Sequence, residues 1–379
     1  MREIKQQMTN AEIRRVNASN LLTSMIAARE RTRGELAAQN DVSVMTVKKI
    51  VDELLALGLL QEKTLQDAAV GRKPKLLSIP PKWGAFVCLS LTSKLFFSYV
   101  LYNLYGEIIE ERQWRLDEAR SYRENLDAFI RQICADVGKS NLELIGVGAS
   151  VPSAYYSAED RVNGDLIPAL KDIKLKALLT EAFHIENVLV AHDVFVAAQS
   201  EYDARAENSM FYFYVGDGVG GALIDRGNWH TGENRLAGEV GQWIIHTSAG
   251  ERTFESCVSV PALLAAQPGV RFLELLQMAD EGVTEAVAAL DRAAETIAQV
   301  LYNVAWVLNP QSIVVGSSYQ RYAERIVAAC TAYNKRLTNL PIRMKITVEQ
   351  SGLNKYGDTR GCFHLLRKHW VDKSTERND

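Results

Sequence analysis

The sequence predicts an α+β protein of several domains, with an N-terminal winged helix-turn-helix followed by two α/β lobes. Its 379 residues exceed what a single compact core usually holds. Helical apolar spacing and a basic loop fill the first eighty residues, and strand-like and helix-like segments then alternate twice. We expect domains at 1–80, 81–200 and 201–359, with a C-terminal helix at 360–379 that returns to the second domain.

Three helices are expected at the N-terminus, at about 11–30, 33–39 and 43–57. The stretch from Thr32 to Glu35 has the S/T-x-x-E form of a capping box, so the second helix should begin there. Ser43 is of the type that caps a helix N-terminus, and Gly58 suits the end of the third helix. This short helix, tight turn and longer helix are the parts of a helix-turn-helix.

The third predicted helix has an apolar face and a polar, basic face. The apolar set, expected in the core, is Val44, Val47, Ile50, Val51, Leu54 and Leu55. Hydroxyls and cations near the helix N-terminus suit base edges and phosphates in the major groove. The residues expected to contact DNA here are Thr32, Arg33, Ser43, Met45, Thr46, Lys48 and Lys49. A plain three-helix bundle with a solvated polar face is the alternative.

Two strand-like segments, at 59–63 and 71–79, flank a polar loop as in the wing of a winged helix. Arg72 and Lys73 stand in a Gly-Arg-Lys-Pro tip that suits contact with phosphates or the minor groove. Residues 1–80 hold 13 Lys and Arg against 9 Asp and Glu, whereas the remainder holds 30 against 37. Chance also produces an asymmetry of this size, but the positive excess lies where the motif predicts a double-stranded DNA operator as partner.

Beyond residue 80, strand and helix candidates alternate as in an α/β fold. The strands are expected at 85–91, 96–103, 107–114, 144–150, 188–191, 210–215, 221–225, 312–315 and 344–348. The helices are expected at 123–138, 173–183, 194–206, 259–267, 282–308 and 319–336. Because the pattern occurs twice, we expect two similar lobes with a ligand cleft between them.

Three acidic residues follow turns in this region. Asp193, preceded by His192, comes after a predicted strand and opens a helix, where it can serve a ligand or simply cap the helix. Glu239 and Glu255 follow later, and the three carboxylates together can accept hydrogen bonds from several sugar hydroxyls. The glycine-rich turn at 216–221 either lets backbone N–H groups approach a phosphate or forms a hairpin that needs positive φ.

Taken together, these stretches resemble the repressor branch of the ROK family (repressors, open reading frames and sugar kinases), of the xylose, N-acetylglucosamine or glucose-responsive type. The resemblance extends over about 11–370. Its further motifs are Gly-Val-Gly-Ala-Ser-Val-Pro at 146–152, Ala-Gly-Glu-Val-Gly at 237–241 and Ile-Val-Val-Gly at 313–316. It implies an actin/hexokinase-like two-lobe fold, a sugar in the cleft, and assembly into homodimers or tetramers.

The phosphate-binding motif of the family's kinases is absent. They begin their first hairpin with Asp-x-Gly-Gly-Thr, whereas residues 88–95 here read Cys-Leu-Ser-Leu-Thr-Ser-Lys-Leu. Gly-Ser-Ser at 316–318 also departs from the family's Gly-Gly. Since nucleotide phosphates need Mg²⁺ and backbone donors, we expect no enzyme activity and no cofactor. Asp193 matches the family's catalytic base and is expected only to hold a sugar hydroxyl.

The family's zinc motif is also missing. Gln242 follows Gly241 where the family has histidine, and no cysteine lies between Gln242 and Glu255, so no metal is expected. The residue in place of the histidine should change the choice of ligand. The expected sugar-binding residues are His192, Asp193, Glu239, Gln242 and Glu255, with either Asn163 or Asp165 in place of the family's asparagine.

Composition favours a cytoplasmic protein. No apolar run approaches the roughly 18 residues of a membrane span, and the first residues lack the apolar core of a signal peptide. The five cysteines are scattered, with no CxxC pair, as expected of reduced thiols. The resemblance therefore implies a homo-oligomeric repressor of a carbohydrate-utilisation operon that responds to a sugar, sugar phosphate or polyol. A sugar kinase with an N-terminal regulatory domain and a regulator controlled by a protein partner are the alternatives.

Overall fold

The structure is a computed structural model that describes residues 9–64, 75–81, 83–164, 166–247, 250–336, 347–353 and 357–376. The chain folds into two compact units. The first comprises Met1–Ala149, Asp172–Val190 and Cys362–Asp379, and the second comprises Ser150–Lys171 and Ala191–Gly361. The winged helix therefore groups with part of the α/β region, while the expected division at 1–80, 81–200 and 201–359 remains a prediction.

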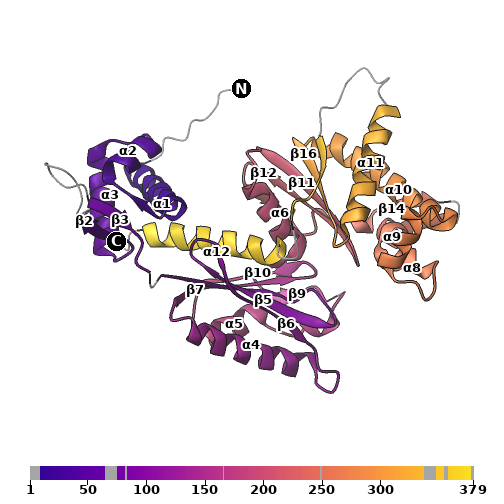
Figure 1. Cartoon of the computed structure of the whole chain (residues 1–379), viewed down its shortest axis with the longest axis horizontal. Helices are drawn as coiled ribbons and strands as arrows, with labels where there is room; N and C mark the ends of the chain where they lie inside the picture. The colour runs from indigo at the N-terminus through magenta and orange to yellow at the C-terminus, as the bar shows by residue number, and fades with distance from the viewer. Residues whose placement is uncertain are drawn as a thin grey trace. The chain divides into compact units, whose positions relative to one another are not determined.

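The N-terminal part of the first unit contains three helices and a three-stranded antiparallel sheet of order β1-β3-β2 (Figure 1). Its elements are α1 (Asn10–Ala28), β1 (Glu30–Arg31), α2 (Arg33–Asn40), α3 (Val44–Ala56), β2 (Gln61–Thr64) and β3 (Lys75–Ser78). The predicted caps are present: the Glu35 amide donates to Thr32 at 3.3 Å, and the Thr46 amide donates to Ser43 at 3.1 Å. The predicted helices and the first wing strand are confirmed, as is the described part of the second, of which residues 71–74 lie outside the described residues; β1 is an addition.

The core of this part lies along one side of α3. Val47, Ile50, Val51 and Leu54 are buried, as their spacing predicts. The prediction for Val44 is wrong, because its side chain is 62% exposed. Val44 belongs to the first turn of α3, ahead of the stripe of residues that the neighbouring helices cover.

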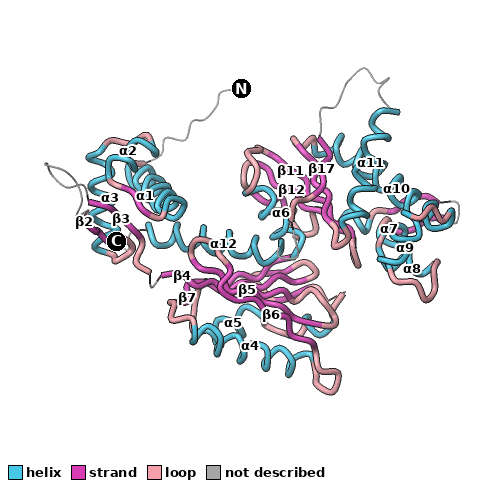
Figure 2. The backbone as a smooth tube through the Cα atoms, in the orientation of Figure 1, coloured by secondary structure: helices cyan, strands magenta, loops and turns pink. Residues whose placement is uncertain are grey.

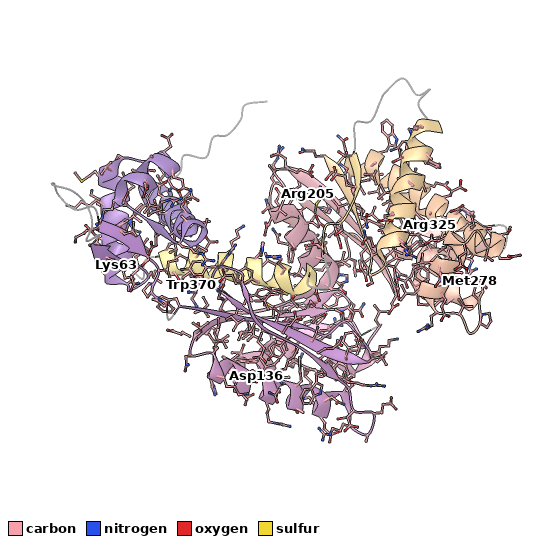
Figure 3. The ribbon with its side chains drawn as sticks, in the orientation of Figure 1. Lys63, Asp136, Arg205, Met278, Arg325 and Trp370 are labelled. Carbon is pink, nitrogen blue, oxygen red and sulfur yellow. The ribbon has the colours of Figure 1, made fainter. Side chains whose placement is uncertain are left out.

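A five-stranded sheet of order β10-β7-β4-β5-β6 forms the centre of the first unit. Its strands are β4 (Trp83–Ser90), β5 (Phe96–Asn103), β6 (Ile108–Arg115), β7 (Glu143–Val151) and β10 (Val188–His192). Helices α4 (Tyr122–Lys139) and α5 (Leu175–Phe183) cover one face, and α12 (Gly357–Thr375) lies on the other (Figure 1). Accordingly, Asp136 on α4 and Trp370 on α12 lie on opposite sides of the sheet (Figure 3).

Aromatic residues on the two faces of β4 and β5 hold these helices. Phe129 of α4 packs against Phe97, with ring centroids 5.4 Å apart. Phe363 of α12 packs against Phe86 and Tyr102, at 5.3 and 5.0 Å. Because side chains alternate between faces along a strand, Phe97 and Tyr102 of β5 serve opposite layers.

The second unit has its own five-stranded sheet, of order β13-β12-β11-β16-β17, with helices on both faces (Figure 2). Its strands are β11 (Ser209–Val215), β12 (Val219–Asp225), β13 (Asn228–His230), β16 (Ser312–Gly316) and β17 (Thr347–Gln350), and its main helices are α6 (Asp193–Asp203), α10 (Thr284–Leu308) and α11 (Gln320–Arg336). Met210 and Tyr212 pack with α6, whereas Phe211 and Phe213 join the core formed with α10 and α11.

Shorter elements complete this unit. They are β8 (Tyr155–Tyr156), β9 (Arg161–Val162), η1 (Pro168–Leu170), η2 (Val240–Gln242), β14 (Ile244–Thr247), β15 (Gly250–Thr253), α7 (Glu255–Val258), α8 (Val260–Ala265) and α9 (Phe272–Asp280). The hairpin β14–β15 and helix α9 are not among the predicted elements. Residues 344–346 of the last predicted strand lie outside the described residues.

None of the helices in the described ranges is long and apolar enough to cross a membrane.

Candidate functional site

The predicted DNA-contacting side chains of α3 divide into two groups. The hydroxyls of Ser43 and Thr46 lie 2.8 Å apart and share a hydrogen bond. By contrast, Met45 is 64% exposed. Lys48 and Lys49 are also exposed, and neither forms an ion pair with any residue that the structure describes. The first turn of α3 therefore presents one apolar side chain from the predicted set, followed by two uncompensated cations.

Thr32 and Arg33 are held inside the winged helix. The Thr32 hydroxyl donates to Glu35 at 3.0 Å within the capping box. Arg33 pairs with Asp52 of α3 at 2.7 Å and with Glu62 of β2. The Arg33 contacts join α2 to α3 and β2, whereas the Thr32 contact stays within the capping box, so both half-buried side chains have partners inside the winged helix.

The tip of the wing lies outside the described residues. This applies to Arg72 and Lys73, and also to Asp165 among the predicted sugar-binding residues. At the base of the wing, Lys75 donates to Glu62 at 2.6 Å. Glu62 is thereby paired with both Lys75 and Arg33. Burial acts to raise the pKa of its carboxyl, but the hydrogen bonds from these two cations outweigh it and hold the pKa below the usual value.

In the second unit, His192, Asp193 and Glu239 form an acidic cluster at the start of α6. His192 Nε2 lies 3.3 Å from Asp193 Oδ1, and His192 Nδ1 lies 3.9 Å from Glu239 Oε1. The Asp193 side chain keeps 25% of its surface exposed, so a ligand can reach it. The helix N-cap is His192, which corrects the alternative that Asp193 caps this helix.

The start of α6 and the segment 238–241 both pack closely against β12. A Cβ on Gly220 would lie 3.3 Å from Val194, and one on Gly241 would lie 2.4 Å from the Val219 carbonyl oxygen. The Gly221 amide also donates to the Gly238 carbonyl at 2.8 Å. The turn at 216–221 does join a hairpin, formed by β11 and β12, but none of its glycines has positive φ, so that part of the alternative is wrong. At Gly220 and Gly221 the reason for glycine is instead space, because a side chain would crowd Val194 or Phe211.

Glu255, the third predicted carboxylate, borders the same strand. Its Oε2 accepts a 2.8 Å hydrogen bond from the Val219 amide and lies 3.3 Å from the position of a Cβ on Gly241. Gln242 is exposed, in the short helix η2 next to this contact. Asn163 is half-buried, and its backbone N–H donates to the Ala154 carbonyl at 2.8 Å.

The electrostatics of the cluster favour one neutral carboxyl group. Desolvation, followed by repulsion from Asp358, raises the pKa of Asp193 to about 7. Burial lowers the pKa of His192, and the Glu239 carboxylate opposes this effect. Near neutral pH, Asp193 is therefore able both to donate and to accept a hydrogen bond, as a ligand hydroxyl does.

Asp358 is a neighbour of this cluster that the sequence patterns did not reveal. It stands at the N-terminus of α12, and its carboxylate accepts a 2.5 Å hydrogen bond from the buried Ser150. Gly361, one turn later, packs so tightly that a Cβ would lie 1.7 Å from the Val196 carbonyl oxygen of α6. The Asp-Thr-Arg-Gly stretch at 358–361 was the only available signal, and it matches no motif by itself.

Among the described residues, no group of three or more His, Cys, Asp or Glu side chains is placed to hold a metal ion.

The chain thus combines a winged helix-turn-helix with an actin/hexokinase-like α/β region that contains an acidic cluster. It belongs to the ROK family, and the sequence model of that family matches residues 96–369.

Relatives of both full and partial length are similar to this chain. The xylose repressor of Caldicellulosiruptor bescii is 22% identical over 93% of this chain and 96% of its own length. An uncharacterized protein of Sinorhizobium fredii is 29% identical over 55% of each chain, so this chain spans little more than half of that relative. The crystal structure of a ROK family transcriptional regulator, a homologue of the Escherichia coli MLC protein, superposes with a TM-score of 0.76. It covers 96% of this chain and 98% of that one at 17% identity, which shows the shared fold.

Proposed function

We propose that this protein is a cytoplasmic, homo-oligomeric transcriptional repressor of a carbohydrate-utilisation operon. Its partner is a double-stranded DNA operator, and its effector is a sugar, sugar phosphate or polyol bound at the acidic cluster. The observation that supports the proposal is the presence in one chain of a winged helix with exposed lysines in the first half of α3 and of the cluster around Asp193. The full-length likeness to a xylose repressor supports it.

DNA binding is tested by selecting duplexes from a random library with the full chain. The proposal expects an enriched sequence and an affinity that falls steeply with salt, because Lys and Arg release counterions from phosphates. Replacing Arg72 and Lys73 together by Ala should weaken binding and reduce the salt dependence. The matched control replaces Arg120 and Arg123, which pair with acidic neighbours near the start of α4, and should leave binding unchanged. Unchanged affinity in the Arg72/Lys73 variant would overturn the wing assignment.

Effector binding is tested by thermal shift across sugars, sugar phosphates and polyols. A true ligand raises the unfolding temperature because it binds only the folded state. The shift should disappear in Asp193→Asn, and the same ligand should release DNA. Linkage then requires the ligand to bind less tightly to the DNA-bound protein.

A sugar kinase is the second candidate, because a carboxyl with a pKa near 7 in the position of the family's catalytic base suits proton transfer. ATP-dependent phosphorylation of a hexose, lost in Asp193→Asn, would establish the kinase and displace the repressor. Against it, Ser90 at the end of β4 and Thr92 in the following loop are hydrogen-bonded to each other in the segment where the family's kinases have their glycine-containing phosphate motif. If no small molecule shifts the unfolding temperature, control by a protein partner becomes the better explanation.

A further inference from the structure

We propose that Val44 and Met45 recognise the C5-methyl groups of thymines in the major groove, an inference that rests on the proposed function of α3 as a recognition helix. Both residues lie in the first turn of α3, the part that reaches base edges in helix-turn-helix proteins. Their side chains are 62% and 64% exposed. They are the large apolar side chains that this turn leaves in solvent.

The polar groups of the same turn already have partners. Ser43 Oγ accepts from the Thr46 amide at 3.1 Å and shares a 2.8 Å hydrogen bond with the Thr46 hydroxyl. These contacts hold both hydroxyls against each other and against the start of the helix backbone, although one O–H of the pair stays free to donate. Val44 and Met45 supply the large exposed apolar surface of the first turn, and the exposed Lys48 and Lys49 follow it within one turn.

The chemistry of the groove identifies the matching base. Thymine is the only standard base that presents a methyl group in the major groove, whereas guanine, adenine and cytosine present hydrogen-bonding groups there. An aliphatic side chain and a thioether satisfy those groups poorly, and they gain from covering a methyl group. The pair therefore selects thymine at the positions it covers, and the two lysines hold the helix to the phosphates without reading sequence.

The test uses the full chain and the duplex selected from a random library. Each thymine of that duplex is replaced singly by deoxyuridine, which lacks only the C5-methyl group. At one or more thymines, wild-type affinity should fall about fourfold, the effect of exposing one methyl-sized group. In Val44→Ala or Met45→Ala, the same replacement should cost clearly less than in the wild type.

Leu57→Ala is the matched control, because Leu57 is 61% exposed at the opposite end of the same helix. This variant should keep the wild-type affinity and the wild-type response to deoxyuridine. Lys49→Ala should weaken binding to the thymine and deoxyuridine duplexes equally. Thermal unfolding confirms that each variant is folded, which the exposure of these side chains favours.

Two outcomes overturn the inference while leaving the proposed function intact. One is a selected duplex that binds equally well when every thymine is replaced in turn. The other is a deoxyuridine penalty that stays at its wild-type size in both Val44→Ala and Met45→Ala. If the library yields no enriched sequence at all, the proposed function itself fails, and the inference fails with it.

Discussion

The Ser19 hydroxyl in α1 donates a 2.9 Å hydrogen bond to Asp372 Oδ1 near the end of α12, across 353 residues of sequence. The winged helix is thus tied to the C-terminal helix within the first unit. The indole N–H of Trp83 adds a 2.9 Å bond to the Gly58 carbonyl, and its ring lies 6.3 Å from that of Trp370. The same α12 begins at Gly357, and its first turn contains Asp358, the neighbour of Asp193 in the acidic cluster.

Replacing Asp372 by Ala should lower the free energy of unfolding by about 1 kcal/mol. The reason is that a partly buried hydroxyl loses a charged acceptor. Urea denaturation of the full chain measures this. The control is Glu376→Ala, which removes only a 3.3 Å pair with Arg15 in which both side chains are more than half exposed. That variant should change stability by less than about 0.5 kcal/mol. Equal effects of the two substitutions would contradict a structural role for the Ser19–Asp372 contact.

Asp193→Asn should stabilise the protein at alkaline pH. The folded-state pKa of Asp193, about 7, exceeds the ordinary value of 3.8. Folding therefore favours the protonated form, an advantage that is complete below pH 4 and lost as the pH rises through 7. The gain in the variant should be at most about 4 kcal/mol at pH 8 and should shrink toward pH 4. Denaturation at a series of pH values measures it, and parallel curves for the two proteins would exclude this cause.

Gly361→Ala should prevent folding of the second unit or destabilise it by about 3 kcal/mol or more. The new Cβ would collide with the backbone of Val196 in α6, which cannot move aside as a flexible side chain would. Gly138→Ala in α4 is the matched control, because apart from its own stretch of helix backbone no atom lies within 4 Å of its Cβ position. It should stabilise the protein by up to about 1 kcal/mol through helix propensity. A folded Gly361→Ala variant of wild-type stability would refute the close contact of α12 with α6.

Arg33→Ala should act through stability. Removing the guanidinium leaves Asp52 and the mostly buried Glu62 with fewer counter-charges, at a cost of about 1–2 kcal/mol. Lys49→Ala should leave the unfolding curve within about 0.5 kcal/mol of the wild type while weakening DNA binding. A stable Arg33→Ala variant with impaired DNA binding would instead restore Arg33 as a direct contact.

Much of the fold follows from short-range patterns. The capping residues Thr32 and Ser43 mark where α2 and α3 begin. Each hydroxyl accepts a hydrogen bond from the backbone N–H three residues later, which is a local contact that the sequence pattern reveals. Nearly continuous apolar runs at β5 and β11 likewise locate a strand of each sheet. The short hairpin β14–β15 and helix α9 escaped because weak local signals did not distinguish them from loops.

The sequence by itself determined the order of the main helices and strands and the points where α2 and α3 begin, because these depend on caps and periodicities within a few residues. Tertiary structure alone decided that Val44 is exposed, that Arg33 is held by Asp52 and Glu62, and that Asp358 lies close enough to Asp193 to raise its pKa. Burial and electrostatic interactions depend on which distant segments meet. That is a property of the packed chain, and no local pattern contains it.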